Sequence, residues 1–231
     1  MGSPTQIYRG LPHFQFPTCG SISPVLCGFD RPKESPPLMT GALTVSTQNE
    51  RLWVYAKYMY DALGQRLRLY EFVSSDNKTF TYDLLMLYRE HIMYQIFDNN
   101  STCTLSPLAG DFVPISIPKG ASLLGQVVLG SSSGPGQGLL VNTWTGDYPG
   151  IEGKFMMTMT EFGCIPVSLA VHTKEYGWMV VSYFNNVIGL SDPSLLNPPS
   201  FCPGKHTAAD SDKEPVDFFK LVPEALRATS N

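Results

Sequence analysis

Residues 51–103 read RLWVYAKYMYDALGQRLRLYEFVSSDNKTFTYDLLMLYREHIMYQIFDNNSTC, and this stretch decides the fold. Aromatic, β-branched and other apolar residues recur in short blocks, which suits the half-buried surface of a sheet. Turn-like clusters interrupt the blocks after Asp61, after Val73 and after Tyr88. The pattern predicts four antiparallel strands joined by three turns, with at least one apolar face.

Alternation within these strands predicts which side chains share a face. Arg66, Arg68 and Tyr70 point to one side of their strand, and Leu67 and Leu69 to the other. The next strand is apolar on both sides, which is typical of a central strand covered on both faces. Its two apolar sets are Tyr82, Leu84, Met86 and Tyr88 on one side and Leu85 and Leu87 on the other, and the following strand groups Ile92, Tyr94 and Ile96.

The rest of the chain continues the same rhythm. A short strand around residues 38–45 precedes the meander, and residues 98–120 are expected to be a loop. Five further strands are expected within residues 121–130, 138–146, 153–162, 165–173 and 177–186. About ten strands with frequent turn signals predict an all-β sandwich or barrel. Residues 1–35 are expected to be extended or partly disordered, residues 36–203 to form the domain, and residues 204–231 to be a tail with a possible short helix.

Composition excludes several classes of protein. Charged residues make up 16% of the 231 residues and the net charge is −4, so no basic surface for nucleic acid is expected. No apolar run is long enough for a membrane-spanning helix. The N-terminus lacks the basic start and apolar core of a signal peptide, so the chain is either cytosolic or a processed or engineered form.

The motifs of catalysis and metal binding lack their structural context. Gly130–Gly134 reads GSSSG and matches the serine nucleophile elbow, with Asp147 and His172 in triad order, but PGQG follows where the elbow requires a helix. We expect a hairpin loop there and no enzyme. The five cysteines, at positions 19, 27, 103, 164 and 202, include no close pair for zinc. They are either scattered thiols or long-range disulfides with one thiol left over. A calcium site built from several loops stays possible, with unknown ligands.

Hydrophobic residues make up 43% of the chain and concentrate in the expected strands, with an adaptable Met-rich segment at residues 155–159. They form either an ordinary filled core or a cavity for an apolar ligand. Turn-located sequons at Asn77, Asn99 and Asn100 are candidate glycosylation sites.

Several segments together resemble the ependymin-related proteins. They are PPLMTGALTV, YMYDALGQRLRLYE, FTYDLLMLYREHIMYQI, Cys103, FGCIPVS and LSDPSLLNPPSFC, spanning roughly residues 36–203. The resemblance implies a secreted or lysosomal, disulfide-bonded glycoprotein. Its fold would be two stacked antiparallel sheets in a half-barrel around a hydrophobic pocket, similar in outline to bacterial lipoprotein carriers. It also implies the pairings Cys103–Cys202 and Cys27–Cys164, with Cys19 unassigned.

The leading hypothesis is therefore an extracellular, possibly lysosomal, carrier of hydrophobic ligands such as fatty acyl chains or glycolipids. Strand alternation selects as candidate pocket-lining residues Leu140, Trp144, Phe155, Met157, Met159, Val167, Leu169 and Val180. The alternative is an extracellular calcium-binding matrix or adhesion protein that acts as a homodimer through its apolar faces. A third hypothesis is an esterase built on Ser132.

Overall fold

The computed structural model describes residues 27, 34–49, 53–75, 78–148, 153–174 and 177–204. Most of the expected N-terminal segment, Cys19, Asn77 and the expected tail helix lie outside these residues. The described chain is all-β, with three short 3-10 helices, η1 (Tyr88–Glu90), η2 (Asp98–Asn100) and η3 (Pro193–Leu196). Its strands are β1 (Leu38–Thr47), β2 (Trp53–Asp61), β3 (Arg66–Ser75), β4 (Lys78–Leu87), β5 (Ile92–Phe97), β6 (Thr102–Pro107), β7 (Ser122–Gly130), β8 (Gly138–Asp147), β9 (Lys154–Thr160), β10 (Pro166–Thr173) and β11 (Gly177–Ile188).

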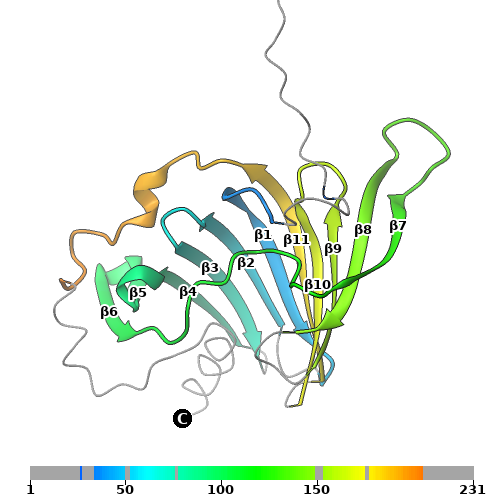
Figure 1. Ribbon diagram of the computed structural model, residues 1–231. Coiled ribbons are helices and arrows are strands. Elements are labelled where there is room, and N and C mark those ends of the chain that lie inside the picture. Colours follow the sequence, from blue (N-terminus) through cyan, green and yellow to red (C-terminus); the bar gives the residue numbers. More distant parts are fainter. Residues whose placement is uncertain are drawn as a thin grey trace, which may run out of the picture.

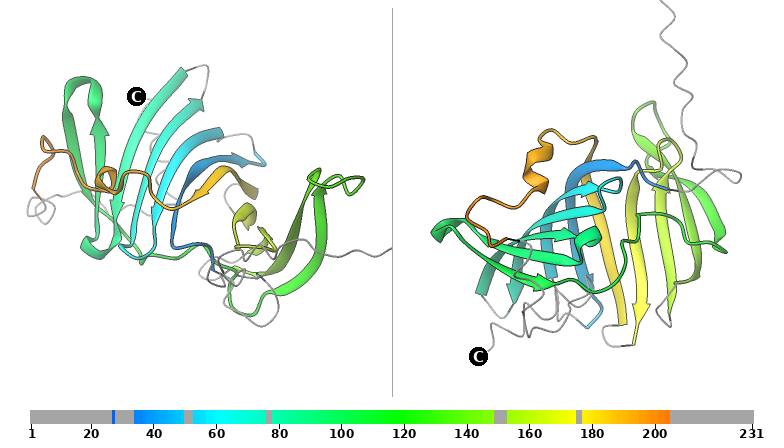
Figure 2. Two further views of the ribbon diagram at one scale, coloured as in Figure 1. Left: turned by 90° about the horizontal axis from the view of Figure 1, so that it is seen from above. Right: turned by 60° about the vertical axis from the view of Figure 1, so that its left-hand side comes forward.

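All eleven strands belong to one open antiparallel sheet, in the order β6-β5-β4-β3-β2-β1-β11-β10-β9-β8-β7 (Figure 1). Two sequential meanders, β1–β6 and β7–β11, therefore meet where β1 pairs with β11. The all-β antiparallel prediction is confirmed. The expected division into two sheets is corrected, because the β1–β11 pairing joins the meanders into one sheet that curves along its strand order (Figure 2).

The meander predicted from residues 51–103 is present, with β2 to β5 separated by the three expected turns. The loop expected over residues 98–120 is wrong in part, because Thr102–Pro107 forms the edge strand β6, which pairs with β5. The sequence TCTLSP places Cys103, Leu105 and Pro107 between polar residues, but this alternation covers only six residues. Pairing with β5 fixes the segment as a strand. Among the described residues, no helix is long and apolar enough to span a membrane.

One face of the sheet carries most of the core, and the segment of residues 108–121 between β6 and β7 packs on it; we call this the connector face. Leu43 and Val45 of β1, Tyr58 of β2 and Leu84 of β4 are buried there with Leu108 of the connecting segment. A neighbouring cluster on β8–β10 shares Ile115 and Leu169 with the first one. The connector face is thus a continuous apolar layer across both meanders.

We call the opposite face of the sheet the groove face. It is covered only in part, by residues 189–202 after β11, which we call the covering segment. Leu85, Ile92 and Tyr94 pack there against Leu196 of η3. The expectation that the strand of residues 80–88 is covered on both sides is confirmed by these two clusters. The disulfide Cys103–Cys202 ties the end of the covering segment to β6.

A β-bulge separates the regular parts of β1 and β11. Thr40 pairs with Val187 and Ala42 with Phe184, so two residues of β11 lie opposite Gly41. Asn185 takes a positive φ of 51°, which asparagine tolerates better than most residues. Gly41 leaves room there for the ring of Tyr58, because a Cβ on residue 41 would approach that ring to 2.9 Å.

Candidate ligand-binding groove

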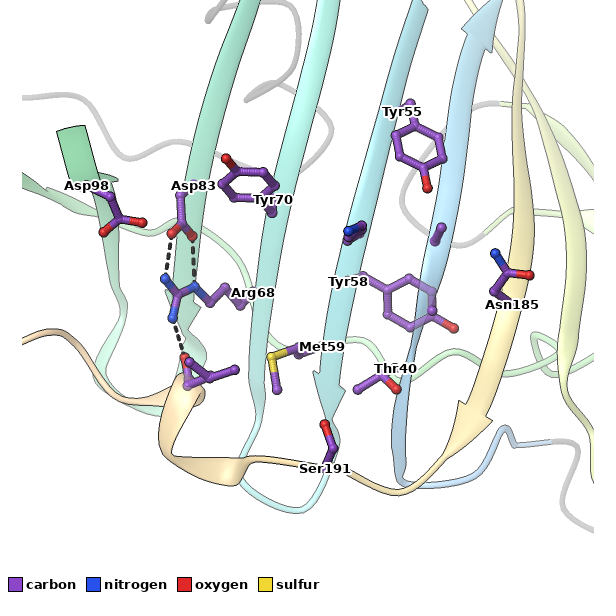
Figure 3. Close-up of a pocket in the computed structure, with 14 residues that line it drawn as sticks. Thr40, Tyr55, Tyr58, Met59, Arg68, Tyr70, Asp83, Asp98, Asn185 and Ser191 are labelled. Carbon is purple, nitrogen blue, oxygen red and sulfur yellow. Dashed lines mark hydrogen bonds and ion pairs between the residues drawn. The ribbon is translucent and has the colours of Figure 1, made fainter.

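An open groove of about 490 Å³ lies on the groove face, between strands β1–β4 and the segment after β11 (Figure 3). This volume is within the range of small-molecule sites, about 300–1,000 Å³. Ser191 and Leu195 of the covering segment form one side of the groove. Its floor consists of sheet residues, among them Thr40, Ala42, Tyr55, Lys57, Met59, Arg68, Tyr70 and Asp83.

Strand alternation explains why β2 supplies three of these side chains. Tyr55, Lys57 and Met59 are two residues apart, so they project from the same face of the strand. The preceding Val54 and the intervening Ala56 and Tyr58 belong to the connector-face core. In register with Lys57 lie Ala42 on β1 and Tyr70 on β3. Lys57 is therefore flanked on the neighbouring strands by one small and one aromatic residue.

The Arg68–Asp83 ion pair forms the charged end of the floor. Arg68 Nε donates to Asp83 Oδ1 at 2.8 Å, and Arg68 Nη2 donates to Oδ2 of the same carboxylate. A third hydrogen bond, 2.7 Å long, runs from Nη1 to the carbonyl oxygen of Leu195. The hydrogen bonds with Asp83 raise the pKa of Arg68 above its ordinary value, against the opposing effect of burial. The guanidinium of Arg68 on β3 thus uses its hydrogen bonds to bind β4 and the covering segment.

Lys57 differs from Arg68 because its ammonium is not used in this way. Its side chain is exposed, and no carboxylate among the described residues forms an ion pair with it. Asp98 of η2 also lines the groove. Lys57 is therefore the cation in the groove that an anionic group of a ligand can pair with.

Tyr58 marks where the groove meets the core. Its hydroxyl donates to Asn186 Oδ1 at 2.6 Å, and Asn186 Nδ2 donates to the carbonyl oxygen of Pro166 at 3.0 Å. Burial, followed by the proximity of Tyr60, raises the pKa of Tyr58 above its ordinary value. The hydroxyl stays protonated and acts as a structural donor that connects β2, β11 and β10.

A sequence model of the family described as Ependymin matches residues 76–202, more than half of the chain. The chain belongs to the ependymin family. Its relatives include Ependymin-1 of Oncorhynchus mykiss, 30% identical over 80% of this chain and 84% of that protein. Ependymin-2 of Carassius auratus is 27% identical over 83% of this chain and 87% of that protein.

Solved structures give weaker matches. An uncharacterized conserved protein from Thermus thermophilus aligns with a TM-score of 0.46 at 11% identity, over 79% of this chain and 91% of that one. A LolA superfamily protein, NE2245 from Nitrosomonas europaea, aligns with a TM-score of 0.32 at 9% identity, over 73% and 92% of the two chains. Scores this low carry no argument about function, so the family assignment rests on the sequence matches.

Both disulfides implied by the family resemblance are present in the structure. Cys27–Cys164 joins the start of the described chain to the turn after β9. Cys103–Cys202 closes a separation of 99 residues and tethers the covering segment near the groove. Among the described residues, these two long-range bridges form the covalent framework of the domain.

Five of the eight predicted pocket-lining residues come together on the connector face, but in a packed cluster. Trp144, Phe155, Met157 and Met159 are at most 2% exposed and belong to one buried cluster with Cys27 and Cys164, and the partly buried Leu169 packs against this cluster. None of the eight lines the described groove. Whether the connector face also opens a cavity for a ligand stays a prediction.

The other three predicted residues lie elsewhere. Val180 pairs with Ala170, whereas Val181 pairs with Leu169. Val180 is therefore on the groove face. The prediction that it lines the same pocket as Leu169 is wrong, because a shift of one residue along the strand moves a side chain to the other face. Val167 lies at a register shift in β10. Leu140 is on the Trp144 side of β8 but further toward the β7–β8 turn, where it is only half-buried.

The candidate triad is not assembled. Ser132 lies in the turn before β8 and Asp147 at the opposite end of that strand, a separation of about 30 Å at about 3.3 Å per residue. Asn99 and Asn100 are exposed in η2, as a glycan acceptor requires, while Asn77 lies outside the described residues. Among the described residues, no group of three His, Cys, Asp or Glu side chains is arranged to hold a metal ion.

Lys57 and its neighbours were not predicted as site residues. The signal was available in WVYAKYMY, where Tyr55, Lys57 and Met59 alternate with the core set. Alternation identifies these residues as one face. It does not reveal that a distant segment, residues 189–202, closes one side of that face to form a groove.

Proposed function

We propose that this ependymin-family chain is a secreted protein that binds amphipathic lipids, with the anionic head near Lys57 and the acyl chain along the groove. The observation that carries the proposal is the exposed ammonium of Lys57, which forms no ion pair among the described residues. Most of the other groove side chains are aromatic, aliphatic or part of the Arg68–Asp83 pair, and the remaining polar ones are Thr40, Asp98, Asn185 and Ser191. A fatty acid combines the two matching chemical groups. The proposal thus narrows the expected class of ligand from hydrophobic molecules in general to lipids with an anionic head.

The residues along the groove support binding of an apolar chain. Ala42, Met59, Leu195 and the ring of Tyr70 offer apolar surface at either side of Lys57. Removing apolar surface from water contributes about 25 cal/mol per Å². Because Tyr70 is 39% exposed without ligand, a bound chain has apolar surface to cover there. Burial would supply affinity, and Lys57 would set the orientation.

The covalent framework supports an extracellular site of action. Two disulfides between segments 99 and 137 residues apart form and persist in oxidising compartments. A secreted carrier has to stay folded without a ligand, and long-range bridges stabilise the folded state mainly by restricting the unfolded chain.

The test is a titration of delipidated protein with the fluorescent fatty acid cis-parinaric acid and, separately, with its methyl ester. We expect Lys57→Met to weaken binding of the acid about tenfold, since one charge-assisted contact is worth about 1.4 kcal/mol. Binding of the uncharged ester should not change. Lys119→Met removes an exposed lysine of the connecting segment and serves as the matched control, with no effect on either ligand.

Two results would contradict the proposal. One is failure of the wild-type protein to bind either ligand. The other is an equal effect of Lys57→Met on acid and ester, because a charge contact distinguishes the two. Tyr70→Ala should weaken both ligands equally, since the ring contacts the chain and not the head.

A further inference from the structure

The hairpin of β7 and β8 extends beyond the rest of the sheet. Strand β8 pairs with β9 only from Val141 to Asp147, whereas its pairing with β7 continues through Leu139–Leu129 to Gly138–Gly130. Residues 128–140 are therefore a two-stranded ribbon with no third strand, and Figure 1 shows its turn reaching past the neighbouring strands. Isolated ribbons of this kind are marginally stable in water.

The hairpin has an unusual composition for a protruding element. No charged residue occurs from Gly120 to Gly146, between Lys119 and Asp147. Instead, apolar side chains of β7 and β8 are open to solvent. Exposed fractions are 64% for Leu124, 54% for Val127, 42% for Val128, 53% for Leu129 and 47% for Leu139.

These side chains occupy both faces of the ribbon. Leu129 lies opposite Leu139 and Val127 opposite Val141, while Val128 lies opposite Leu140. Successive residues of a strand point to opposite faces, so Leu129 and Val128 cannot be covered by one flat protein surface. A fluid apolar phase solvates both faces at once. The charge-free surface and its two apolar faces therefore favour a lipid bilayer over a second protein.

The turn of the hairpin suits the same environment. Its sequence is SSSGPGQ, without charge. Ser131 N donates to the carbonyl oxygen of Gln137 at 3.0 Å, and Gln137 N donates to that of Gly134 at 3.3 Å. Backbone groups paired within the turn lower the cost of leaving water. The exposed Phe162 lies in the turn between β9 and β10. That turn is next to the hairpin, because Glu161 N donates to the carbonyl oxygen of Leu140 at 3.0 Å.

We propose that the β7–β8 hairpin is a membrane-contact element, which inserts its tip into the interfacial layer of a lipid bilayer. Two features limit the depth. β7 is the edge of the sheet, with backbone groups on its outer side that cannot pair in hydrocarbon. The carboxylate of Glu161 lies at the base, where it accepts hydrogen bonds from Gln126 Nε2 at 3.2 Å and from Asn142 Nδ2.

The proposal predicts a particular lipid dependence. Because the hairpin has no charge, binding needs no anionic lipid and does not weaken with salt, unlike binding through basic residues. The inference is independent of the groove and its ligand, since the groove lies on β1–β4, across the strand order from β7 and β8.

The test is flotation of the full chain with vesicles of phosphatidylcholine alone, at low and at high salt. We expect the wild-type protein to float equally at both. The double variant Val127→Glu, Leu129→Glu should lower the bound fraction at least tenfold. Val113→Glu puts the same charge at an exposed valine of the connecting segment and should float like the wild type. All three proteins are to show the same near-ultraviolet circular dichroism, which ensures that folding is intact.

Three outcomes would overturn the proposal. They are absence of flotation with phosphatidylcholine, flotation that requires anionic lipid and disappears with salt, and equal flotation of the double variant. Sedimentation of the same proteins identifies a competing role. If the wild type is a dimer that does not float, and the double variant is a monomer, the hairpin is an interface between copies of this chain.

Discussion

Arg68 of β3 and Asp83 of β4 form a two-pronged ion pair across adjacent strands, with side chains only 15% and 5% exposed. The third arm of the guanidinium donates to the carbonyl oxygen of Leu195. One arginine therefore connects the second half of the first meander to the segment that closes the groove. Sheet stability and the shape of the site depend on the same side chain.

Replacing Arg68 with methionine should destabilise the protein by about 3 kcal/mol, because the buried carboxylate of Asp83 loses its partner. Chemical denaturation measures the change. The control is Lys154→Met, which breaks the ion pair with Asp147; both side chains of that pair are exposed, so no measurable loss is expected. Equal stability of the two variants would refute the structural role of Arg68.

Cys103→Ser should lower both stability and groove affinity. Opening a bridge that spans 99 residues costs about 4–5 kcal/mol in the chain-entropy account. It also releases the covering segment from β6, so cis-parinaric acid should bind more weakly at temperatures where the variant is still folded. Cys164→Ser opens the other bridge, which lies against the connector-face cluster. Cys164→Ser should lower stability and leave the affinity for cis-parinaric acid unchanged. Loss of binding in both variants would contradict the view that the Cys103–Cys202 bridge supports the groove specifically.

Phe155→Ala distinguishes a packed core from a ligand-lining position on the connector face. The side chain is 1% exposed, and removing a buried phenylalanine costs about 3–5 kcal/mol. Its neighbour Met156 projects from the other face and is 43% exposed, so Met156→Ala should have little effect. Thermal unfolding compares the two, and a cost below about 1 kcal/mol for Phe155→Ala would indicate an open cavity around it instead.

Gly41→Ala should destabilise the β1–β11 junction by about 1–3 kcal/mol. The added methyl group would lie 2.7 Å from Asn186 Oδ1 and 2.9 Å from the ring of Tyr58, two groups that hydrogen-bond each other. Gly125→Ala is a matched control in β7, since a Cβ there meets nothing within 4 Å. Similar unfolding midpoints for the two variants would show that the junction tolerates the added group.

The order of the strands illustrates the limits of the sequence patterns. Alternation in residues 51–97 predicts β2 to β5, their turns and the double-sided burial of β4, because these features depend on neighbours in the chain. The pairing of β1 with β11 does not depend on neighbours in the chain. The two strands are far apart in sequence, and no local pattern selects a partner for either of them. The expectation of two sheets failed at that junction.

The site shows the same division. Sequence alone determined the all-β class, the two faces of β3 and, through the family resemblance, the two cysteine pairs, because each of these follows from local periodicity or from recognisable motifs. Only the tertiary structure decided that Val180 faces away from Leu169, that Lys57 lies in a groove and that the end of the β7–β8 hairpin extends beyond the sheet. Each of these depends on register and on which distant segment covers a face, and both are set by packing across the whole chain.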